Sequence, residues 1–285
     1  MNSTTKFGLV VVGFHSDDVW DVFFDGIRES TLKPLSIVVV ENGLSVSHRV
    51  RELAELPIRI LHRPNNPGYG TAANIGVQEL PASCEWVVIA NPDVRLECDT
   101  LEKLFDARDT FPQTGILGPQ IKTPSGATYP SARAIPGIRI GVGHALLGRL
   151  WPKNPWTSRY LGVYGDAEAR TTGWLSGAFL LVKREIFELA GGFDEGYFMF
   201  FEDVDLCFRL RMLGFRNVYV PSSVITHSGA HATKSSRREM IHAHHKSAER
   251  FLSKLYPRRS QAALRVLIRI GLRLRSAIES SLSHQ

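Results

Sequence analysis

Three acidic residues, Glu202, Asp203 and Asp205, stand close together directly after an aromatic run at 197–201. Carboxylates are common at the start of a helix, because the free backbone amides and the helix dipole favour negative charge there. The aromatic side chains would also surround the acids with apolar surface, which raises the pKa of a carboxyl toward that of a working base. The cluster therefore predicts either an ordinary helix start or a general base that takes a proton from a hydroxyl group.

A second chemical signal is Asn91-Pro92-Asp93, which follows the apolar run 86–90. A carboxylate at the end of a buried strand can hold a hard divalent cation, and such a cation neutralises a nucleotide diphosphate. The alternative is a simple β-turn, because Asn, Pro and Asp all favour turns. Spacing alone leaves both interpretations open.

The elements that position these residues follow from the apolar runs of the first half. Apolar stretches predict four strands, at 7–14, 35–40, 58–61 and 86–90, of which the first two are expected to be buried parallel strands. Helices are expected between them, at 18–29, at 45–55 and after the turn 65–76. This alternation predicts an α/β fold with an open, Rossmann-like, mostly parallel sheet flanked by helices, whose ligands bind beyond the carboxyl ends of the strands. The residues expected to converge there are Phe14-His15, Glu41-Asn42 and Asn91-Pro92-Asp93.

The second half is expected to extend the sheet and to carry a binding flap. An apolar run predicts a strand at 175–182, and shorter strands are expected at 215–220 and 224–227. Asp205 is expected to pair with Arg209, four residues further along the helix that the acids open. The segment 119–170 is rich in Pro, Gly, aromatic and basic residues, which favours a functional flap over a disordered loop.

Composition limits the environment and the partners. The chain has 285 residues and a formal net charge of +6, with a short polar N-terminus that does not resemble a signal peptide. Cys84, Cys98 and Cys207 have no paired spacing, which predicts free thiols in a reducing compartment. No apolar run reaches the ~18 residues that a membrane-spanning helix needs. The excess positive charge lies in 250–275, so we expect no nucleic-acid partner for the main body.

The C-terminal region predicts two helices, at 235–256 and 259–280. In the second helix three arginines form one stripe and four apolar residues form the opposite face: Arg265, Arg269 and Arg273, against Leu267, Ile270, Leu274 and Ile278. Such a helix can lie in an anionic membrane surface, or dock on the main body or on a second subunit of a homodimer. His242, His244 and His245 point in different directions on a helix and are not expected to form one metal site.

Several motifs together resemble the family 2 inverting glycosyltransferases, which have the GT-A fold. They are Trp174-x-x-Gly177-Ala, then Gly191-Gly192-Phe-Asp-Glu, then Glu202-Asp203-Val-Asp-Leu-Cys, and earlier Gly68-x-x-x-Ala-x-Asn74-x-Gly76. The resemblance implies a GT-A domain over 1–232, with the acceptor-side flap at 119–170, and a C-terminal helical extension over 233–285.

The resemblance also implies roles for individual residues. Asp203 matches the general base, with Glu202 as a neighbour that tunes it. Asp93 stands where the family has an Asp-x-Asp motif, and His227 matches a histidine that could complete a Mn²⁺ or Mg²⁺ site. The implied donor-binding residues are Phe14, Glu41, Asn42, Gly68, Asn74, Asn91 and Asp93, although the family usually has Asp in place of Glu41. The implied acceptor-binding residues are Arg133, Trp174, Ser176 and Gly177.

Motifs in the flap, at 129–133, 144–148 and 151–157, resemble one branch of the family more narrowly, the rhamnosyltransferases of cell-wall synthesis. The segment 243–247, outside the flap, shares this narrower resemblance. This resemblance implies a dTDP-L-rhamnose donor, a polyprenyl-diphosphate-linked N-acetylglucosamine acceptor and a position on the inner face of the plasma membrane. The alternatives are a related transferase with another nucleotide sugar or a polysaccharide acceptor, a sugar nucleotidyltransferase, and a non-catalytic carbohydrate-binding protein.

Overall fold

The structure is a computed structural model that describes the chain except residues 1–5, 44–49, 51–54, 138–167, 230–236 and 283–285. The helix expected at 45–55 therefore lies almost wholly outside the described residues, as do the flap motifs at 144–148 and 151–157. The side chain of Ile278 lies outside them as well.

The four strands predicted in the first half form one parallel sheet. They are β1 (Phe7–Gly13), β2 (Ser36–Glu41), β3 (Ile58–His62) and β4 (Trp86–Ala90), in the spatial order β3-β2-β1-β4. In β1 the alternate residues Leu9 and Val11 belong to one apolar core and Val10 and Val12 to the other. Both faces of the strand are buried, which is why its sequence is continuously apolar.

The second half continues this sheet with strands of both directions. β11 (Phe179–Lys183) runs antiparallel to β4, and it is followed by β6 (Thr114–Lys122), β12 (Arg216–His227) and β5 (Val94–Leu96). β7 (Thr128–Tyr129) pairs with β6 and β9 (Arg170–Thr172) with β12, while β8 (Ala132–Arg133) and β10 (Trp174–Leu175) form a separate two-stranded sheet.

Around Pro119 the structure differs from what the sequence predicted for this half. The boundary expected for the flap, at 119, falls inside the interior strand β6, whose sequence is interrupted by Gly118 and Pro119. Pro119 has no N–H to donate, and the neighbouring strand shifts register beside it, between Val220 and Val224. Because of this bulge, the two short strands expected at 215–220 and 224–227 are one strand, β12.

The strand expected at 175–182 is also divided. β10 ends at Leu175 and β11 begins at Phe179, so 176–178 leave the sheet. The backbone of Ser176 is held by a hydrogen bond from its N–H to the carbonyl of Ser131. This interruption brings Ser176 and Gly177 to the edge where the parallel strands end.

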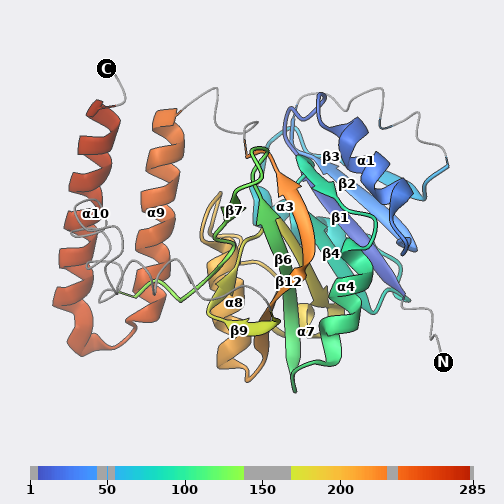
Figure 1. Cartoon of the computed structure of the whole chain (residues 1–285). Helices are drawn as coiled ribbons and strands as arrows, with labels where there is room; N and C mark the ends of the chain where they lie inside the picture. Colours follow the sequence, from blue (N-terminus) through green and yellow to red (C-terminus); the bar gives the residue numbers. More distant parts are fainter. Residues whose placement is uncertain (1–5, 44–49, 51–54, 138–167, 230–236, 283–285) are drawn as a thin grey trace.

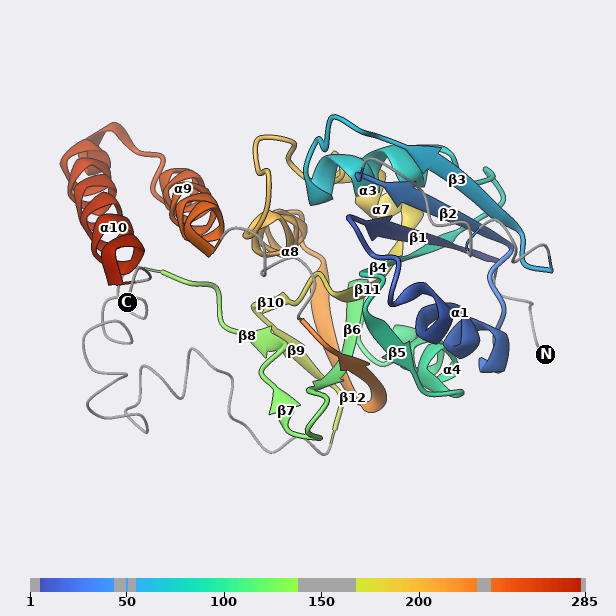
Figure 2. The same cartoon turned by 90° about the horizontal axis from the view of Figure 1, so that it is seen from above.

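Helices cover both faces of the sheet (Figure 2). α1 (Trp20–Glu29), α4 (Thr100–Asp106) and the short turn η1 (Ala107–Asp109) pack on one face. α3 (Tyr69–Gln78), α7 (Arg184–Leu189) and α8 (Glu202–Met212) pack on the other. The result is a three-layer α/β/α arrangement with the acid cluster at the start of α8.

The two expected C-terminal helices are confirmed as α9 (Arg237–Leu255) and α10 (Ala262–Leu282), joined through η2 (Arg259–Gln261). They lie side by side beyond α8, with α10 outermost (Figure 1). Phe251 anchors α9, since it is fully buried and its ring centroid lies 5.8 Å from those of Phe201 and Phe208. No helix within the described residues has both the length and the apolar content needed to cross a bilayer.

The arginine stripe of α10 faces α9, whereas a stripe that contacted a membrane would point away from it. Arg265 donates to the carbonyl of Tyr256, and Arg269 donates to Glu249 of α9 at 2.5 Å. The apolar side chains of Leu267, Ile270 and Leu274 are exposed instead. The three cysteines are free thiols.

Candidate active site

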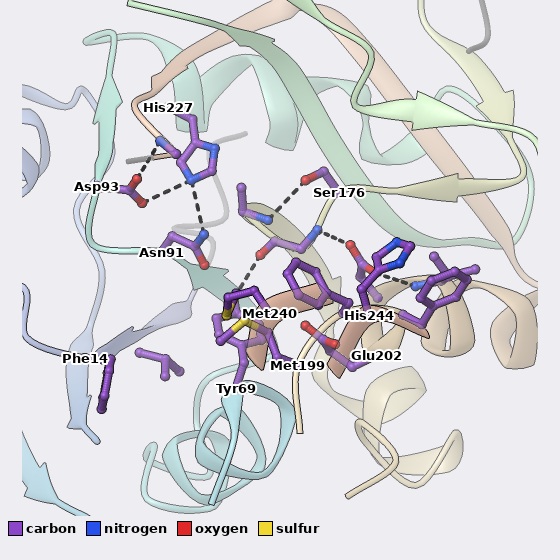
Figure 3. Close-up of a pocket in the computed structure, with 18 of the residues that line it drawn as sticks. Phe14, Tyr69, Asn91, Asp93, Ser176, Met199, Glu202, His227, Met240 and His244 are labelled. Carbon is purple, nitrogen blue, oxygen red and sulfur yellow. Dashed lines mark hydrogen bonds and ion pairs between the residues drawn. The ribbon is translucent and has the colours of Figure 1, made fainter. Parts of the chain in front are cut away.

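A cavity of about 470 Å³ opens where β1 and β4 end, and α8 and α9 close its other side (Figure 3). The interrupted segment 176–178 and the strands β8 and β10 complete its wall. The predicted site residues that line it are Phe14, Asn42, Asn91, Asp93, Arg133, Trp174, Ser176, Gly177, Glu202, Asp203 and His227. Eleven of the fourteen residues expected at the site thus meet in one cavity, although they come from distant parts of the sequence.

The carboxylate of Asp203 is fixed by two backbone amides. Gly177 N–H donates to Oδ2 at 2.8 Å and Val204 N–H donates to Oδ1 at 2.7 Å. Burial raises the pKa of Asp203 above its usual value, while the two amides and the positive charge of Arg133 act in the opposite direction. A raised pKa with a fixed orientation suits a carboxylate that must take a proton.

The neighbouring residue Glu202 is almost fully enclosed, with 7% of its surface exposed. Its Oε2 is buried and has no hydrogen-bond partner within the described part of the chain. Burial and the adjacent charge of Asp203 raise the pKa of Glu202 to about 8. Glu202 is therefore largely protonated at pH 7, below its pKa, and its neutral carboxyl group adds little negative charge beside Asp203.

The turn that leads into α8 is strained. Phe200 and Phe201 both have a φ of 66°, in the left-handed region that non-glycine residues rarely adopt. Such a conformation costs on the order of 1–3 kcal/mol per residue and persists only where the surrounding structure holds it. Here it aims the start of α8 into the cavity and turns the aromatic run around the acids.

A second polar group lies across the cavity, where β5 pairs with the end of β12. The register pairs His227 with Val94, which sets its Nε2 3.0 Å from Asp93 Oδ1. Ser228 Oγ–H and Gly229 N–H donate to Asp93 Oδ2 at 2.9 and 2.8 Å. Burial raises the pKa of Asp93, but the hydrogen bond and charge of His227 and these two donors outweigh it, so its pKa is below the usual value.

The donor atoms of Asp93 and His227 fit a shared divalent cation. Two ligands at ~2.1 Å from an octahedral cation, and at right angles to one another, lie ~3.0 Å apart, which is the spacing of Oδ1 and Nε2. Asn91 Nδ2 lies 3.2 Å from the same Nε2. The described residues include no group of three or more acidic, histidine or cysteine side chains in metal-binding proximity, so phosphate or water would complete the shell.

Three residues expected to bind the donor do not line the cavity. Gly68 has a φ of 93°, and a Cβ there would lie 2.3 Å from the carbonyl oxygen of Phe198. The Asn74 amide donates to the carbonyl of Phe193 at 2.9 Å and accepts from its N–H at 2.8 Å. Both residues hold the segment 193–198 that precedes the acids, so the motif positions the aromatic run.

Glu41, the third of these residues, is buried behind the cavity. Its Oε1 accepts a hydrogen bond from Gly43 N–H at 2.8 Å, and burial raises its pKa. Its immediate neighbour Asn42 does line the cavity. The carboxylate therefore shapes the loop after β2.

The wall where acceptor-binding residues were expected combines a cation with aromatic rings. The guanidinium of Arg133 lies 5.2 Å from the ring centroid of Tyr129 and 5.3 Å from that of Trp174. Flat apolar faces beside a cation are suited to a sugar ring that carries a charged substituent.

Sequence reasoning missed several residues of the wall. The Tyr69 hydroxyl donates to the carbonyl of Gly177 at 2.8 Å, and so supports the peptide that holds Asp203. Met240 and His244 project from α9 into the cavity, and Met199 lies beside them (Figure 3). The spacing of 240 and 244 on one helix face was a usable signal, but only once α9 was known to cover α8.

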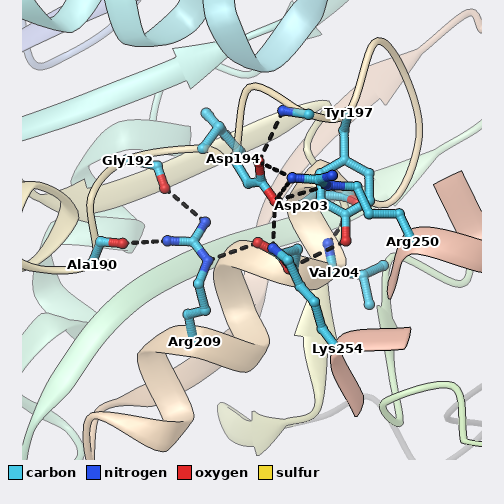
Figure 4. A network of polar contacts seen from close by, with 12 residues as sticks. Ala190, Gly192, Asp194, Tyr197, Asp203, Val204, Arg209, Arg250 and Lys254 are labelled. Carbon is cyan, nitrogen blue, oxygen red and sulfur yellow. Dashed lines mark hydrogen bonds and ion pairs between the residues drawn. The ribbon is translucent and has the colours of Figure 1, made fainter. Parts of the chain in front are cut away.

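A polar network behind the acids locks α9 to α8 (Figure 4). The predicted pair is confirmed, since Arg209 Nε donates to Asp205 Oδ2 at 2.7 Å. Lys254 of α9 donates to Asp205 at 2.6 Å and also to Asp194, and Arg250 binds both oxygens of Asp194. These bonds lower the pKa of Asp194 against the effect of burial. The helix that begins with Glu202 and Asp203 is therefore held in place by the C-terminal region.

The chain matches the profile described as "Glycosyltransferase like family 2" over residues 5–243. It is 40% identical over 264 residues to the N-acetylglucosaminyl-diphospho-decaprenol L-rhamnosyltransferase of Mycobacterium tuberculosis, covering 89% of this chain and 86% of that protein. It is 31% identical over 196 residues to rhamnosyltransferase WbbL of Escherichia coli (strain K12), covering 66% and 70%. The chain belongs to glycosyltransferase family 2.

Solved structures agree on the fold. The mannosyltransferase PcManGT from Pyrobaculum calidifontis, in complex with GDP-Man and Mn²⁺, superposes with a TM-score of 0.60 at 17% identity, over 89% of this chain and 64% of that one. GalNAc-T7 with UDP, GalNAc and Mn²⁺ gives 0.59 at 14% identity, over 80% and 44%. The predicted GT-A fold is confirmed, and the protein is a glycosyltransferase.

Proposed function

We propose that this protein transfers L-rhamnose from dTDP-L-rhamnose to a polyprenyl-diphosphate-linked N-acetylglucosamine, with inversion at the anomeric carbon. The reaction class is carried by one observation, the half-buried and amide-fixed carboxylate of Asp203 in the same cavity as the Asp93–His227 pair. The substrates rest on the relative from Mycobacterium tuberculosis, which aligns over most of both chains.

The geometry suggests how the residues divide the work. Asp203 removes the proton of the acceptor hydroxyl while the oxygen attacks the anomeric carbon, and the nucleoside diphosphate leaves with the electron pair of the broken bond. Asp93 and His227 would hold Mn²⁺ or Mg²⁺, which supplies charge stabilisation for the leaving diphosphate. Glu202, neutral beside the base, keeps the local negative charge low.

The experiment that tests this proposal compares donors on one acceptor. The purified protein is incubated with a diphosphate-linked N-acetylglucosamine and either dTDP-L-rhamnose or UDP-sugars, and nucleotide release and product mass are measured. Release of dTDP with addition of one deoxyhexose supports the proposal. Turnover of a UDP-sugar with dTDP-L-rhamnose inert would establish the related-transferase alternative. Release of pyrophosphate in a parallel incubation with a nucleoside triphosphate and a sugar 1-phosphate would indicate a nucleotidyltransferase.

We also propose that α10 lies on the inner surface of the plasma membrane, where a lipid-linked acceptor resides. Leu267, Ile270 and Leu274 are exposed on one face, with exposed fractions of 66%, 50% and 61%. Arg273 and Arg275 of the same helix are exposed as well. A helix that exposes both apolar and basic side chains binds anionic lipid through hydrophobic and electrostatic attraction together.

Replacing Leu267, Ile270 and Leu274 with serine should weaken binding to anionic phospholipid vesicles at least about tenfold, because each buried apolar side chain contributes roughly 1.5–3 kcal/mol. Vesicle sedimentation measures this, with turnover on a short-chain acceptor as the check of the fold. A matched control replaces three apolar residues that are equally exposed elsewhere, Val22, Leu189 and Met212. Equal vesicle binding by the two triple variants would remove the membrane role of α10.

A further inference from the structure

A second cavity, of about 430 Å³, lies on the other side of the strands β8 and β9. Four of the residues that line it are arginines, and no acidic residue is among the described residues of its lining. The arginines are Arg133 of β8, Arg170 of β9, Arg211 of α8 and Arg216 of β12. We call this the arginine groove. Four separate segments build it, so its charge is assembled by the fold and not by a basic run in the sequence.

Two of the four arginines are held against aromatic rings. Antiparallel pairing sets Arg170 opposite Tyr219, and its guanidinium lies 4.7 Å from the centroid of that ring. Arg133 lies against Tyr129 and Trp174, and its Nε donates to the carbonyl of Pro130 at 2.6 Å. Stacking of this kind fixes the plane of a guanidinium before any ligand arrives, so less conformational entropy is lost on binding.

Such a cluster of arginines is suited to a multivalent anion such as a phosphate group. Like charges brought together around a small cavity repel one another, and a multivalent anion relieves this repulsion. Guanidinium groups bind phosphate through paired N–H donors, which gives both strength and orientation.

The arginine groove also adjoins the active site. Arg133 lines both cavities, and its positive charge acts on Asp203. In the acceptor of the proposed function, one sugar ring separates the reacting hydroxyl from a diphosphate. A sugar held near Asp203 would thus have its diphosphate close to Arg133.

We propose that the arginine groove binds the diphosphate of the lipid-linked acceptor, with Arg133 at its junction with the active site. This inference rests on the proposed function. Such a groove would allow the enzyme to distinguish a diphosphate-linked sugar from the same sugar on a neutral carrier.

The test removes the two arginines that are furthest from the chemistry, as the double variant Arg211→Gln/Arg216→Gln. For a short-chain diphosphate-linked N-acetylglucosamine in detergent, KM should rise at least about tenfold, as expected for lost charge-assisted hydrogen bonds. The KM for the donor, kcat, and the KM for a neutral alkyl glycoside of N-acetylglucosamine should stay within twofold. The control Arg59→Gln/Arg108→Gln removes two surface arginines that line neither cavity and should change none of these values.

Direct binding separates this inference from the proposed function. With the donor site saturated by dTDP and Mn²⁺, calorimetry should show inorganic pyrophosphate binding to the wild-type protein at least about tenfold more tightly than to the double variant. An unchanged KM for the diphosphate acceptor, or an equal rise for the neutral glycoside, would overturn the assignment. A rise in acceptor KM that is seen when the acceptor is presented in anionic vesicles, but not in detergent, would overturn it too. The groove would then bind a lipid headgroup and not the diphosphate. If the wild-type protein turns over no rhamnose donor, the proposed function fails and the pyrophosphate measurement alone decides the groove.

Discussion

The Asp203→Asn variant should lose about three orders of magnitude in kcat, within the 10²–10⁴-fold contribution of a general base. Asparagine has nearly the same shape, but its amide cannot take the proton of the attacking hydroxyl. It can still accept from one of the two amides that hold the carboxylate, Gly177 N–H or Val204 N–H. We therefore expect unchanged donor affinity by calorimetry and a small change in the melting temperature.

The adjacent residue provides the matched control. Glu202 is neutral below its pKa of about 8, so Glu202→Gln removes no charge at pH 7 and should keep activity within tenfold of wild type. Above pH 8 the Glu202 side chain of the wild-type protein ionises beside Asp203. The activity of the wild-type protein should therefore fall above pH 8, while that of Glu202→Gln should not. A loss in Glu202→Gln as large as in Asp203→Asn would show that the base has been assigned to the wrong acid.

The dependence of protein stability on pH provides a second measurement on the Glu202→Gln variant. The carboxyl of Glu202 ionises near pH 4.5 in the unfolded chain and near 8 in the folded protein. The folded state therefore binds the extra proton between these values, and the stability contributed by the neutral group is lost as pH rises from about 4.5 to about 8. Glu202→Gln should flatten this part of the curve of unfolding free energy against pH.

The parts of the fold that could be predicted are the strands whose apolar pattern lies in one continuous stretch of sequence. β1, β2 and β4 are uninterrupted apolar runs with both faces buried, so their residues carry the signal alone. β6 could not be predicted in this way, because Gly118 and Pro119 break its pattern and the compensating bulge lies about a hundred residues away, in β12.

The site residues that could be predicted are likewise those that belong to a recognisable local element. Asp93, Asn91 and Asp203 stand at the ends of recognisable elements, and the cavity contains all three. Asn74 belongs to a motif that could be found, but its amide contacts Phe193, across 119 positions of sequence, and a pattern does not reveal such a partner. The arginine groove is the extreme case, because no two of its four arginines are neighbours in one motif.

The second large effect is expected at the opposite wall of the cavity. Asp93→Ala and His227→Ala should each raise the Mn²⁺ concentration that half-saturates activity by more than about a hundredfold, since losing a direct ligand should exceed the 10–100-fold cost of losing an outer-shell partner. Ser228 supplies such an outer contact, because its hydroxyl donates to Asp93 Oδ2 while Oδ1 faces His227. Ser228→Ala should therefore show the smaller, 10–100-fold effect.

Nucleotide binding measured with and without EDTA distinguishes a metal ligand from a residue that contacts the donor directly. If Asp93 and His227 act through the cation, both alanine variants should match wild type in EDTA and differ from it only when Mn²⁺ is added. A variant that binds dTDP more weakly in EDTA as well would be in direct contact with the nucleotide. Unchanged Mn²⁺ dependence in both variants would remove the pair as a metal site, and the short distance between Oδ1 and Nε2 would then be an ordinary hydrogen bond that joins β12 to the turn after β4.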